Sequence, residues 1–309
     1  MKGKTLYNGR YKLGEVIDTG GFAVICIADE SGRDDLVAIK LCNRFEDDYY
    51  RQSLVQEATI IQKFNHRGIV KLRPIVRDGK ASVFYANAIE LPHQPAFFVM
   101  EYLKGGTLSN YVHFTGQLTP AESASIGLDI ARALDHIHQK GFAHNDLKLE
   151  NIVFRNPVKS QSPFEPVLVD FGIATRIQPP SAVTFYIMAP EQLPGERVQD
   201  TAKVDVWGLG VIIYRMLGGR LPFSGQNEKS ITSRIRELRP TSLRQLSPQV
   251  TSGLDSLIID GCLAKNPSDR LTLLELAQEL KRYGDQVPAS KSGPPDKSQK
   301  INWRFWQRS

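Results

Sequence analysis

Three stretches of this sequence decide the fold: HNDLKLEN at residues 144–151, LVDFG at 168–172 and APE at 189–191. Between them they place two acids and one amide in short polar loops: Asp146, Asp170 and Asn151. Taken singly, Asp146 is explained equally well as a helix N-cap or turn acid, and the second stretch as a tight turn after a strand. Because the stretches occur together and in this order, we interpret them as parts of one site.

In this order and spacing, the stretches resemble those that mark the eukaryotic-type (Hanks-type) protein kinase family, from about Tyr11 to Tyr283. The resemblance implies an α+β, two-lobed fold with a small β-rich N-lobe and a larger, mostly α C-lobe. The N-lobe is expected at residues 11–103, with one long helix, and the C-lobe at 104–283. Residues 1–10 are then an N-terminal extension, and 284–309 form a linker-like tail with an aromatic and basic end.

The resemblance also implies a role for each polar residue in transferring the γ-phosphoryl group of ATP. Asp146 accepts or orients the proton of the substrate hydroxyl, and Lys148 reaches the γ-phosphate as a point charge. Asp170 and Asn151 supply oxygen ligands for Mg²⁺, or for Mn²⁺ in its place. We therefore expect a protein kinase that uses ATP and a divalent metal ion.

A further charged group is expected around Lys40, at the end of the stretch Val37-Ala38-Ile39-Lys40. In a strand, alternation puts Ala38 and Lys40 on the same face. An interior lysine needs a counter-charge, which Glu57 on the following helix can supply while the other ammonium donors reach phosphate oxygens. Taken alone, the tetrapeptide is better explained by a lysine on the surface of a strand.

The turn Asp18-Thr19-Gly20-Gly21-Phe22-Ala23 lies between two predicted strands, where glycines let backbone N–H groups approach phosphates. It resembles the kinase G-x-G-x-x-G loop, although Asp18 and Ala23 replace the outer glycines. By the same resemblance Met100 is the gatekeeper before the adenine-binding hinge, or else simply fills the core. The residues expected to bind ATP are Gly20, Gly21, Phe22, Ile25, Ala38, Lys40, Glu57, Met100, Glu101, Leu103 and Val153.

Other residues resemble structural supports of the family. Glu191 and Arg270 are expected to form an ion pair, and Asp205 to hold the backbone of the catalytic loop. An apolar column that aligns the lobes is expected to contain Ile61, His144 and Phe171.

Substrate class and control are also suggested by the resemblance. Lys148 after Asp146 is typical of the Ser/Thr branch, so Ser and Thr acceptors are favoured. The usual H-R-D is here His144-Asn145-Asp146, and a neutral Asn cannot pair with a phosphorylated activation loop. We therefore expect activity without loop phosphorylation. The loop nevertheless offers three candidate acceptors, of which the last also matches the threonine that the family places against the catalytic Asp: Thr175, Ser181 and Thr184.

Local patterns outside the motifs agree with a β-rich first lobe and a helical second lobe. Short β-branched runs precede Met100, with one helix expected at about residues 50–64. The clearest later helix starts at a capping box, Thr119 to Glu122, and ends at Gly141. Further helices are expected at about 203–217, 253–264 and 270–282, and inserted or mobile segments at 78–94 and 156–166.

Composition limits the function classes. A hydrophobic fraction of 41% with 23% charged residues indicates a folded globular protein, and no stretch reaches the ~18 continuous apolar residues of a membrane span. The net charge of +6 is spread along the chain, so nucleic-acid binding is not expected. Three distant cysteines, Cys26, Cys42 and Cys262, argue against a disulfide framework or a zinc site and favour a reducing cytoplasm.

Two other functions remain open. A pseudokinase, which keeps the fold as an ATP-binding scaffold, would explain Asp18, Ala23 and Asn145, whereas the intact acids and lysines favour an enzyme. A small-molecule kinase of related fold is less favoured, because Thr184 and Asp205 resemble parts that shape a peptide-docking segment.

The tail also has two interpretations. It is either an inert linker or a short anchor for a partner or for the kinase itself. The anchor would be the aromatic and basic residues of 301–309, namely Trp303, Arg304, Phe305, Trp306 and Arg308.

Overall fold

The computed structural model describes residues 1–44, 48–77, 81–159, 162–171 and 185–286. These residues divide into two compact units. The first unit comprises Met1–Lys104 together with Asp170 and Phe171. The second unit comprises Gly105–Val169 and residues 185–286.

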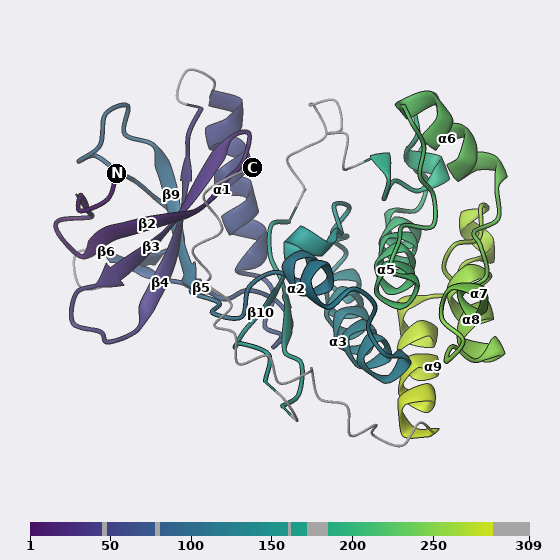
Figure 1. The fold of residues 1–309 in the computed structure, drawn as a ribbon. Coiled ribbons are helices and arrows are strands. Elements are labelled where there is room, and N and C mark those ends of the chain that lie inside the picture. The colour runs from purple at the N-terminus through teal and green to yellow at the C-terminus, as the bar shows by residue number, and fades with distance from the viewer. Residues whose placement is uncertain (45–47, 78–80, 160–161, 172–184, 287–309) are drawn as a thin grey trace. The chain divides into compact units, whose positions relative to one another are not determined.

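The first unit is built on an antiparallel sheet in the order β1-β2-β3-β4-β9-β5, with β8 also paired to β9. Figure 1 shows these strands in purple and blue. A separate two-stranded ladder joins β6 and β7. The strands are β1 (Thr5–Leu6), β2 (Tyr11–Thr19), β3 (Ala23–Glu30), β4 (Leu36–Cys42), β5 (Leu72–Arg73), β6 (Ile75–Arg77), β7 (Ala81–Val83), β8 (Ala86–Asn87) and β9 (Ala96–Glu101).

Alternation along β4 separates a core face from a face that carries chemistry. Val37, Ile39 and Leu41 join one apolar cluster with residues of β2, β3 and β9. Ala38 and Lys40 are also buried, but they point to the other face, as expected for a period of two. The sheet therefore holds Lys40 between two well-packed neighbours of its own strand.

One helix, α1 (Asp48–Ile61), packs against β4 and β9 within the first unit (Figure 1). It is the only helix in the part of that unit that the structure describes, as the sequence predicted. Its buried side chains include Leu54, Ala58 and Ile61, which recur at helical spacing. Glu57 lies among them and is 5% exposed, so the same face that buries apolar groups also carries a carboxylate.

Residues 1–10, which we expected as an extension, contribute a strand to the sheet. Thr5 pairs with Lys12 and Leu6 with Tyr11, and both Leu6 and Tyr11 are fully buried. The chain reverses between β1 and β2 with Tyr7 and Asn8 in left-handed backbone conformations. Burial of Leu6 explains why this short segment is held in place.

The second unit is mainly helical. Its long helix α3 packs against both α5 and α9, and Figure 1 shows α3 and α9 side by side. The helices are α2 (Leu108–Thr115), α3 (Pro120–Gln139), α5 (Thr201–Gly218), α6 (Glu228–Glu237), α7 (Leu243–Leu246), α8 (Ser252–Ile259) and α9 (Leu273–Gln286). In the described part of this unit, a small hairpin and three 3₁₀ turns accompany the helices: β10 (Ile152–Phe154), β11 (Pro166–Leu168), η1 (Leu149–Asn151), η3 (Pro190–Gln192) and η4 (Pro267–Asp269).

Helix ends follow the expected local chemistry in α3. Thr119 and Glu122 form the predicted capping box, Pro120 occupies the first turn, and Gly141 has a φ of 78° just beyond the end. The helix predicted at 253–264 ends earlier, at Ile259, and the one predicted at 270–282 begins only at Leu273. In the second case the side chain of Thr272 accepts the N–H of Glu275 and so caps the helix later than expected.

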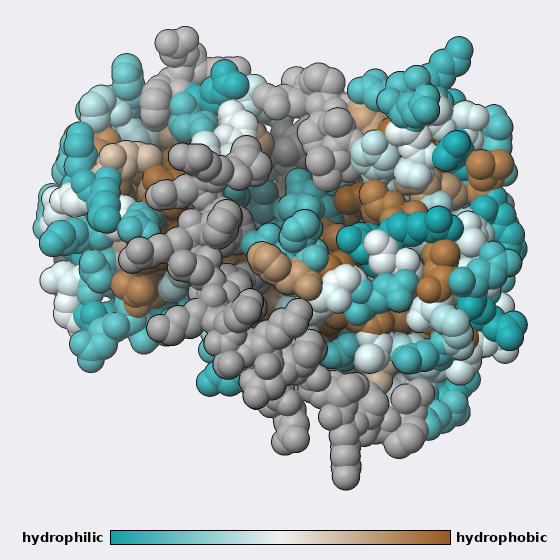
Figure 2. Space-filling model, viewed as in Figure 1, coloured by the Kyte–Doolittle hydropathy of each residue, from teal (hydrophilic) through white to brown (hydrophobic). Residues whose placement is uncertain are grey.

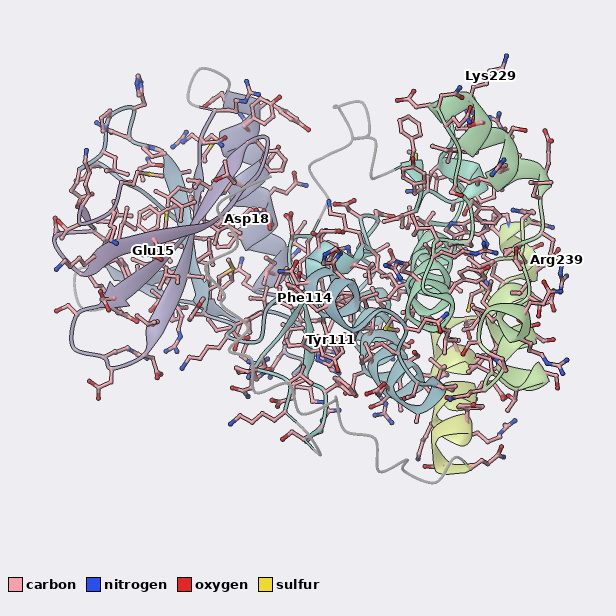
Figure 3. All side chains as sticks on the ribbon, viewed as in Figure 1. Glu15, Asp18, Tyr111, Phe114, Lys229 and Arg239 are labelled. Atoms are coloured by element: carbon pink, nitrogen blue, oxygen red, sulfur yellow. The ribbon has the colours of Figure 1, made fainter. Side chains whose placement is uncertain are left out.

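Of the two segments expected as insertions, 81–94 contributes β7, β8 and a turn, whereas the described residues of 156–165 contain neither helix nor strand. Phe164 of the latter contacts Tyr111 of α2, with ring centroids 5.9 Å apart. Tyr111 and Phe114 are labelled on α2 in Figure 3.

Large apolar side chains such as Trp207 and Tyr214 are almost completely buried. On the face shown in Figure 2, hydrophobic residues of the helical unit are interspersed with hydrophilic ones. In the part of the chain that the structure describes, no helix combines the length and the hydrophobicity needed to span a bilayer.

Candidate active site

The functional side chains of the first unit centre on Lys40 in β4. Its Nζ lies 2.8 Å from each carboxylate oxygen of Glu57 and 2.7 Å from Oδ1 of Asp170. The side chains of Lys40 and Glu57 are each 5% exposed, and that of Asp170 is 39% exposed. The predicted pairing of Lys40 with Glu57 is confirmed. Asp170 is a second partner that no local pattern indicated.

One ammonium group shared by two carboxylates sets the electrostatics of this cluster. Burial alone would lower the pKa of Lys40, but the charges of Asp170 and Glu57 outweigh it and raise that pKa above its ordinary value. Burial and the charge of Asp170 raise the pKa of Glu57 to about 7, although the charge of Lys40 opposes this shift. Lys40 is therefore held as a cation, and Glu57 is poised to titrate near neutrality.

Asp170 and Phe171 are fixed by local geometry as well as by charge. Asp170 has a φ of 59°, in the left-handed region that Asp tolerates better than most residues. Phe171 stacks on Phe64 with ring centroids 5.5 Å apart and an angle of 26° between the rings. We did not single out Phe64, although it follows Ile61 at helical spacing just beyond α1. Gly172 lies outside the described residues.

The glycine-containing turn links β2 to β3. The N–H of Gly20 donates to the carbonyl of Ala23, and the carbonyls of Gly20 and Gly21 accept bonds from the side chains of Asn43 and Arg44. Phe22 stacks on Tyr50 of α1 at 6.0 Å. The turn is thus tied to the end of β4 and to α1.

Asp18, labelled near the end of β2 in Figure 3, uses its side chain locally. Its Oδ1 accepts the N–H of Thr19 at 2.8 Å. An aspartate that bonds its own turn stabilises the chain reversal, but it adds a negative charge where a glycine was expected.

Strand register places most of the predicted adenine-binding residues around Lys40. Ile25 is the cross-strand partner of Lys40, and Ala38 is that of Met100. Directly opposed residues share a face of the sheet, so these four side chains lie on the face that carries the ammonium group. Glu101 ends β9, and its N–H donates to the carbonyl of Lys71. Leu103 follows in the segment that ends the first unit, and its side chain is half-buried.

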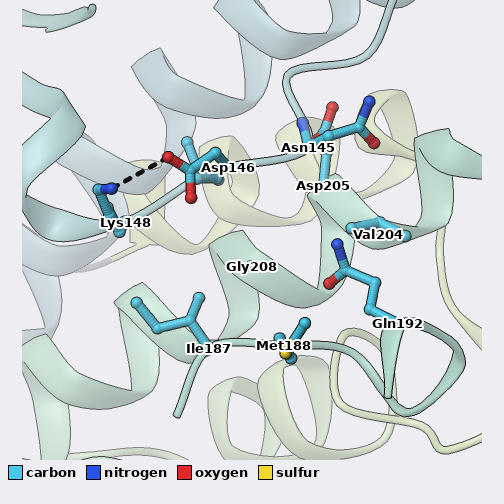
Figure 4. Close-up of a pocket in the computed structure, with 10 residues that line it drawn as sticks. Asn145, Asp146, Lys148, Ile187, Met188, Gln192, Val204, Asp205 and Gly208 are labelled. Carbon is cyan, nitrogen blue, oxygen red and sulfur yellow. Dashed lines mark hydrogen bonds and ion pairs between the residues drawn. The ribbon is translucent and has the colours of Figure 1, made fainter. Parts of the chain in front are cut away.

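The functional side chains of the second unit lie in the loop after α3. Oδ2 of Asp146 accepts from Nζ of Lys148 at 3.0 Å and from Nδ2 of Asn151 at 3.1 Å. The same amide nitrogen donates to the backbone carbonyl of Asp146 at 2.8 Å. Figure 4 shows Lys148 directed at the carboxylate of Asp146. The loop therefore holds Asp146 in one orientation, with one of its oxygens already bonded.

Asp205, at the start of α5, holds this loop by its backbone, as predicted. It is fully buried, and its two oxygens accept the N–H groups of His144 and Asn145, each at 2.8 Å. Nε2 of His138 lies 2.7 Å from the same carboxylate. We did not select His138 from the sequence. Its place directly after the buried Ile137 in α3 is the available signal, because a polar group beside a core position needs a hydrogen-bond partner.

We expected Asn145 at the position where the kinase motif usually has arginine. Its φ is 63°, a conformation that Asn adopts more readily than most residues. Its backbone N–H is bound by Asp205, and its side-chain amide lies 3.5 Å from the carbonyl of Ala143. The substitution is therefore compatible with the loop geometry, while it removes a positive charge.

Val153 of β10 pairs with Val167 of β11 and forms a bridge to Thr107. Next to this hairpin, the N–H of Val169 donates to the carbonyl of Asn151. The hairpin thereby connects the segment before Asp170 to the loop that carries Asn151.

Glu191 and Arg270 form the predicted ion pair, with two contacts of 2.6 and 2.8 Å. The guanidinium also donates to the carbonyls of Lys203, Ala264 and Lys265 and stacks on Trp207. The side chain of Arg270 is completely buried. With all its donors used, this pair ties residues 189–192 to the helical unit.

Oxygen donors for a metal ion are present in both units. Among the described residues, no group of three or more His, Cys, Asp or Glu could hold a metal ion on its own. Asp170 offers a partly exposed carboxylate, and Asn151 keeps its carboxamide oxygen because its nitrogen is bonded to Asp146. Each is a hard oxygen donor of the kind that Mg²⁺ takes.

Other predicted positions cannot be placed. The candidate loop acceptors Thr175, Ser181 and Thr184 lie outside the described residues, as does the end of the tail from residue 287.

The described residues have the architecture of a protein kinase. A strand-rich unit carries one helix and a buried Lys–Glu pair, and the helical unit that follows carries an Asp–Lys–Asn loop. The chain belongs to the protein kinase family, because the family model for the protein kinase domain matches residues 11–281. The predicted two-lobed α+β fold is thereby confirmed.

Among solved structures, the crystal structure of Rad53 1–466 in complex with AMP-PNP is similar, with a TM-score of 0.70 and 25% identity. The similarity covers 89% of this chain and 66% of that one.

Two curated relatives are bacterial. Serine/threonine-protein kinase PrkC of Bacillus subtilis (strain 168) is 28% identical over 278 residues, which cover 87% of this chain and 39% of PrkC. Serine/threonine-protein kinase PknB of Mycolicibacterium smegmatis is 31% identical over 295 residues, covering 90% of this chain and 44% of PknB. The chain thus spans about two fifths of the length of these relatives.

Proposed function

We propose that this chain is a serine/threonine protein kinase that transfers the γ-phosphoryl group of ATP to Ser and Thr hydroxyls of proteins. The observation that carries the proposal is the orientation of Asp146 by Lys148 and Asn151, on a loop held by the buried Asp205. Phosphoryl transfer depends mainly on positioning and charge stabilisation, and these contacts provide both. The serine/threonine-kinase names of PrkC and PknB support the same acceptor class.

In the first unit, Lys40 is the group proposed to bind phosphate oxygens. Glu57 holds the ammonium group from α1, and Asp170 is its second partner. On this proposal, Lys40 would bind ATP phosphates, and the carboxylate of Asp170 would be one of the groups available to hold a metal ion. Ile25, Ala38 and Met100 form the apolar surface for adenine on the same face of the sheet. Gly20, Gly21 and Phe22 supply the turn beside the phosphates.

In the second unit, Asp146 is proposed to receive the hydroxyl proton. A bond forms between the hydroxyl oxygen and the γ-phosphorus, while the bond from that phosphorus to the bridging oxygen breaks and ADP leaves. Lys148 stabilises the charge on the moving phosphoryl group. Mg²⁺ or Mn²⁺, when bound, supplies further charge neutralisation, and Asp170 and Asn151 are the residues that would hold it.

The direct test is transfer of radiolabelled phosphate from ATP with Mg²⁺ or Mn²⁺ to generic protein substrates. Asp146→Ala and Asp170→Ala should each abolish labelling of Ser and Thr. Asp29→Ala, which removes an exposed carboxylate on β3, is the matched control and should retain it. If the wild-type protein binds ATP but transfers nothing, the alternative proposal of an ATP-binding pseudokinase replaces this one.

We also propose that activity does not require a phosphorylated activation loop. The support is Asn145, which is neutral and whose backbone N–H is already bound by Asp205. Phosphatase-treated wild type and a variant with Thr175 and Ser181 changed to Val should then keep their activity towards a peptide. Thr184 is retained in this variant because it also matches a structural threonine of the family. Loss of activity after phosphatase treatment would contradict the proposal.

A cytoplasmic location is a further proposal, supported by the free and buried state of Cys26, Cys42 and Cys262. Fractionation of cells that express the chain tests it. The role of residues 301–309 as an anchor for a partner or for the kinase also stays a proposal. Deletion of residues 287–309 tests that role by activity and binding.

A further inference from the structure

Arg215 in the last turn of α5 is a half-buried cation to which no role has yet been given. Its Nη1 atom is buried and has no hydrogen-bond partner among the described residues. Burial lowers the pKa of this guanidinium, and no carboxylate among the described residues raises it. Removing an arginine from water without a compensating anion is costly, so such a group in a folded protein suggests a missing partner.

Helix geometry places Arg215 on the side of α5 that carries the catalytic loop. Gly208 lies seven residues earlier, which corresponds to almost two turns and leaves the two positions only about 20° apart around the axis. A Cβ atom added to Gly208 would lie 3.2 Å from Cβ of Leu147, so this side of the helix touches the residue next to Asp146. Figure 4 shows Gly208 on α5 between Asp146 and the segment with Ile187 and Met188.

The spacing along the helix suits a peptide substrate. Seven residues of α-helix advance by about 10 Å, and an extended peptide advances by about 3.3 Å per residue. A side chain roughly three residues from the acceptor hydroxyl can therefore reach Arg215 while the hydroxyl lies at Asp146. The residues between Phe171 and Phe185 contain neither Asp nor Glu, so that segment brings no carboxylate of its own.

The position of Arg215 near the end of a helix has a simpler explanation, which is attraction to the negative end of the helix dipole. That attraction requires neither burial nor loss of hydrogen bonds, because other basic side chains at helix ends remain in water. Arg236 in the last turn of α6, for instance, donates to the carbonyl of Pro194 and approaches Glu196. The dipole alone leaves the buried, unbonded Nη1 unexplained.

We propose that Arg215 is a specificity-determining residue that binds an acidic side chain of the substrate, about three residues from the phosphorylated Ser or Thr. The inference rests on the proposed function and adds a substrate class to it: acceptor sites flanked by Asp or Glu. An acidic group from the peptide would supply the counter-charge that this half-buried guanidinium lacks.

The experiment measures kcat/KM for peptides with one acceptor Ser, in which Asp, Lys or Ala is placed in turn at each flanking position. For wild type, Asp at the best position should raise kcat/KM roughly 10- to 100-fold over Ala, mainly through KM. Arg215→Gln should remove that preference, Arg215→Lys should keep part of it, and Arg215→Glu should favour Lys instead. Arg282→Gln, in the exposed Arg282–Glu279 pair of α9, is the matched control and should behave as wild type.

The outcomes separate this inference from the proposed function. If wild type phosphorylates none of the peptides or generic substrates, the proposed function fails, and this inference fails with it. If wild type phosphorylates Ala peptides and shows no preference for Asp, the inference alone is overturned. If Arg215→Gln lowers the melting temperature but leaves an Asp preference intact, Arg215 has only a structural role and the inference is also overturned.

Discussion

At the scale of single residues, Glu57 shows how burial and neighbouring charge together set a protonation state. Its carboxylate lies 2.8 Å from Lys40, yet its pKa is raised to about 7 because burial and Asp170 outweigh that attraction. A bound metal ion on Asp170 would remove part of the opposing charge. On the proposed function, nucleotide binding would therefore be coupled to the ionisation of a residue on α1.

This coupling predicts a pH dependence of stability. Folding raises the pKa of Glu57 from 4.5 to about 7, so the contribution of Glu57 to stability is complete below pH 4.5 and is lost as the pH rises through about 7. The free energy of unfolding of wild type, relative to Glu57→Gln, should fall across this window by on the order of 3 kcal/mol. Urea unfolding at a series of pH values measures it, and a constant difference between the two proteins would contradict the assigned shift.

The ion pair between Arg270 and Glu191 predicts a large effect of a single truncation. Arg270→Ala leaves Glu191 without its partner in a site where the carboxylate side chain is 9% exposed, and should cost about 3–5 kcal/mol. Arg282→Ala removes an arginine that is 64% exposed and should cost less than about 1 kcal/mol. Denaturant unfolding of both variants provides the comparison. Equal losses would mean that burial of the first pair does not control its contribution.

At the scale of secondary-structure elements, α5 is the helix that organises the second unit. Its second turn holds the catalytic loop through Asp205, its middle packs against other helices, and its last turn carries Arg215. Gly210, in the middle of α5, allows a close contact with a neighbouring segment. A Cβ atom on Gly210 would lie only 2.5 Å from Cβ of Cys262.

Replacing glycine by alanine should consequently change the free energy of unfolding in opposite directions at two helix positions. Gly210→Ala should lower the free energy of unfolding by about 1–3 kcal/mol, because backbone or side chains must move to admit the methyl group. Gly253→Ala in α8, where no atom lies within 4 Å, should stabilise the protein by up to about 1 kcal/mol. Thermal unfolding of the two variants checks the contrast, which a stabilising Gly210→Ala would refute.

At the scale of the whole molecule, ATP binding and catalysis should be separable by mutation. A non-hydrolysable ATP analogue with Mg²⁺, at about 100 times its Kd, should stabilise wild type by roughly 2.7 kcal/mol. Asp146→Ala should retain this gain because Asp146 is proposed to act on the substrate hydroxyl, whereas Asp170→Ala should lose most of it. Thermal shift measurements decide between the two roles. A loss of the gain in Asp146→Ala alone would reverse the assignment.

Prediction from sequence succeeded where the physical requirement is local or depends on a few residue types in a fixed order. The capping box at Thr119 needs only Thr and Glu three residues apart, and α3 begins there. The Asp146–Lys148–Asn151 group needs close spacing in one loop, and the structure brings these side chains within hydrogen-bonding distance. The Lys40–Glu57 pair follows from one strand, one helix and the need of a buried lysine for a counter-charge.

The tertiary structure alone decided the contacts that join distant parts of the chain. The bond from Lys40 to Asp170, the approach of His138 to Asp205 and the lack of a partner for Arg215 among the described residues have no local signature. Their physical reason is that packing selects which side chains meet after the backbone has folded, and a sequence pattern records periodicity rather than long-range proximity. The sequence by itself therefore determined the family and the order of the chemical groups, and the fold determined their partners and their charge states.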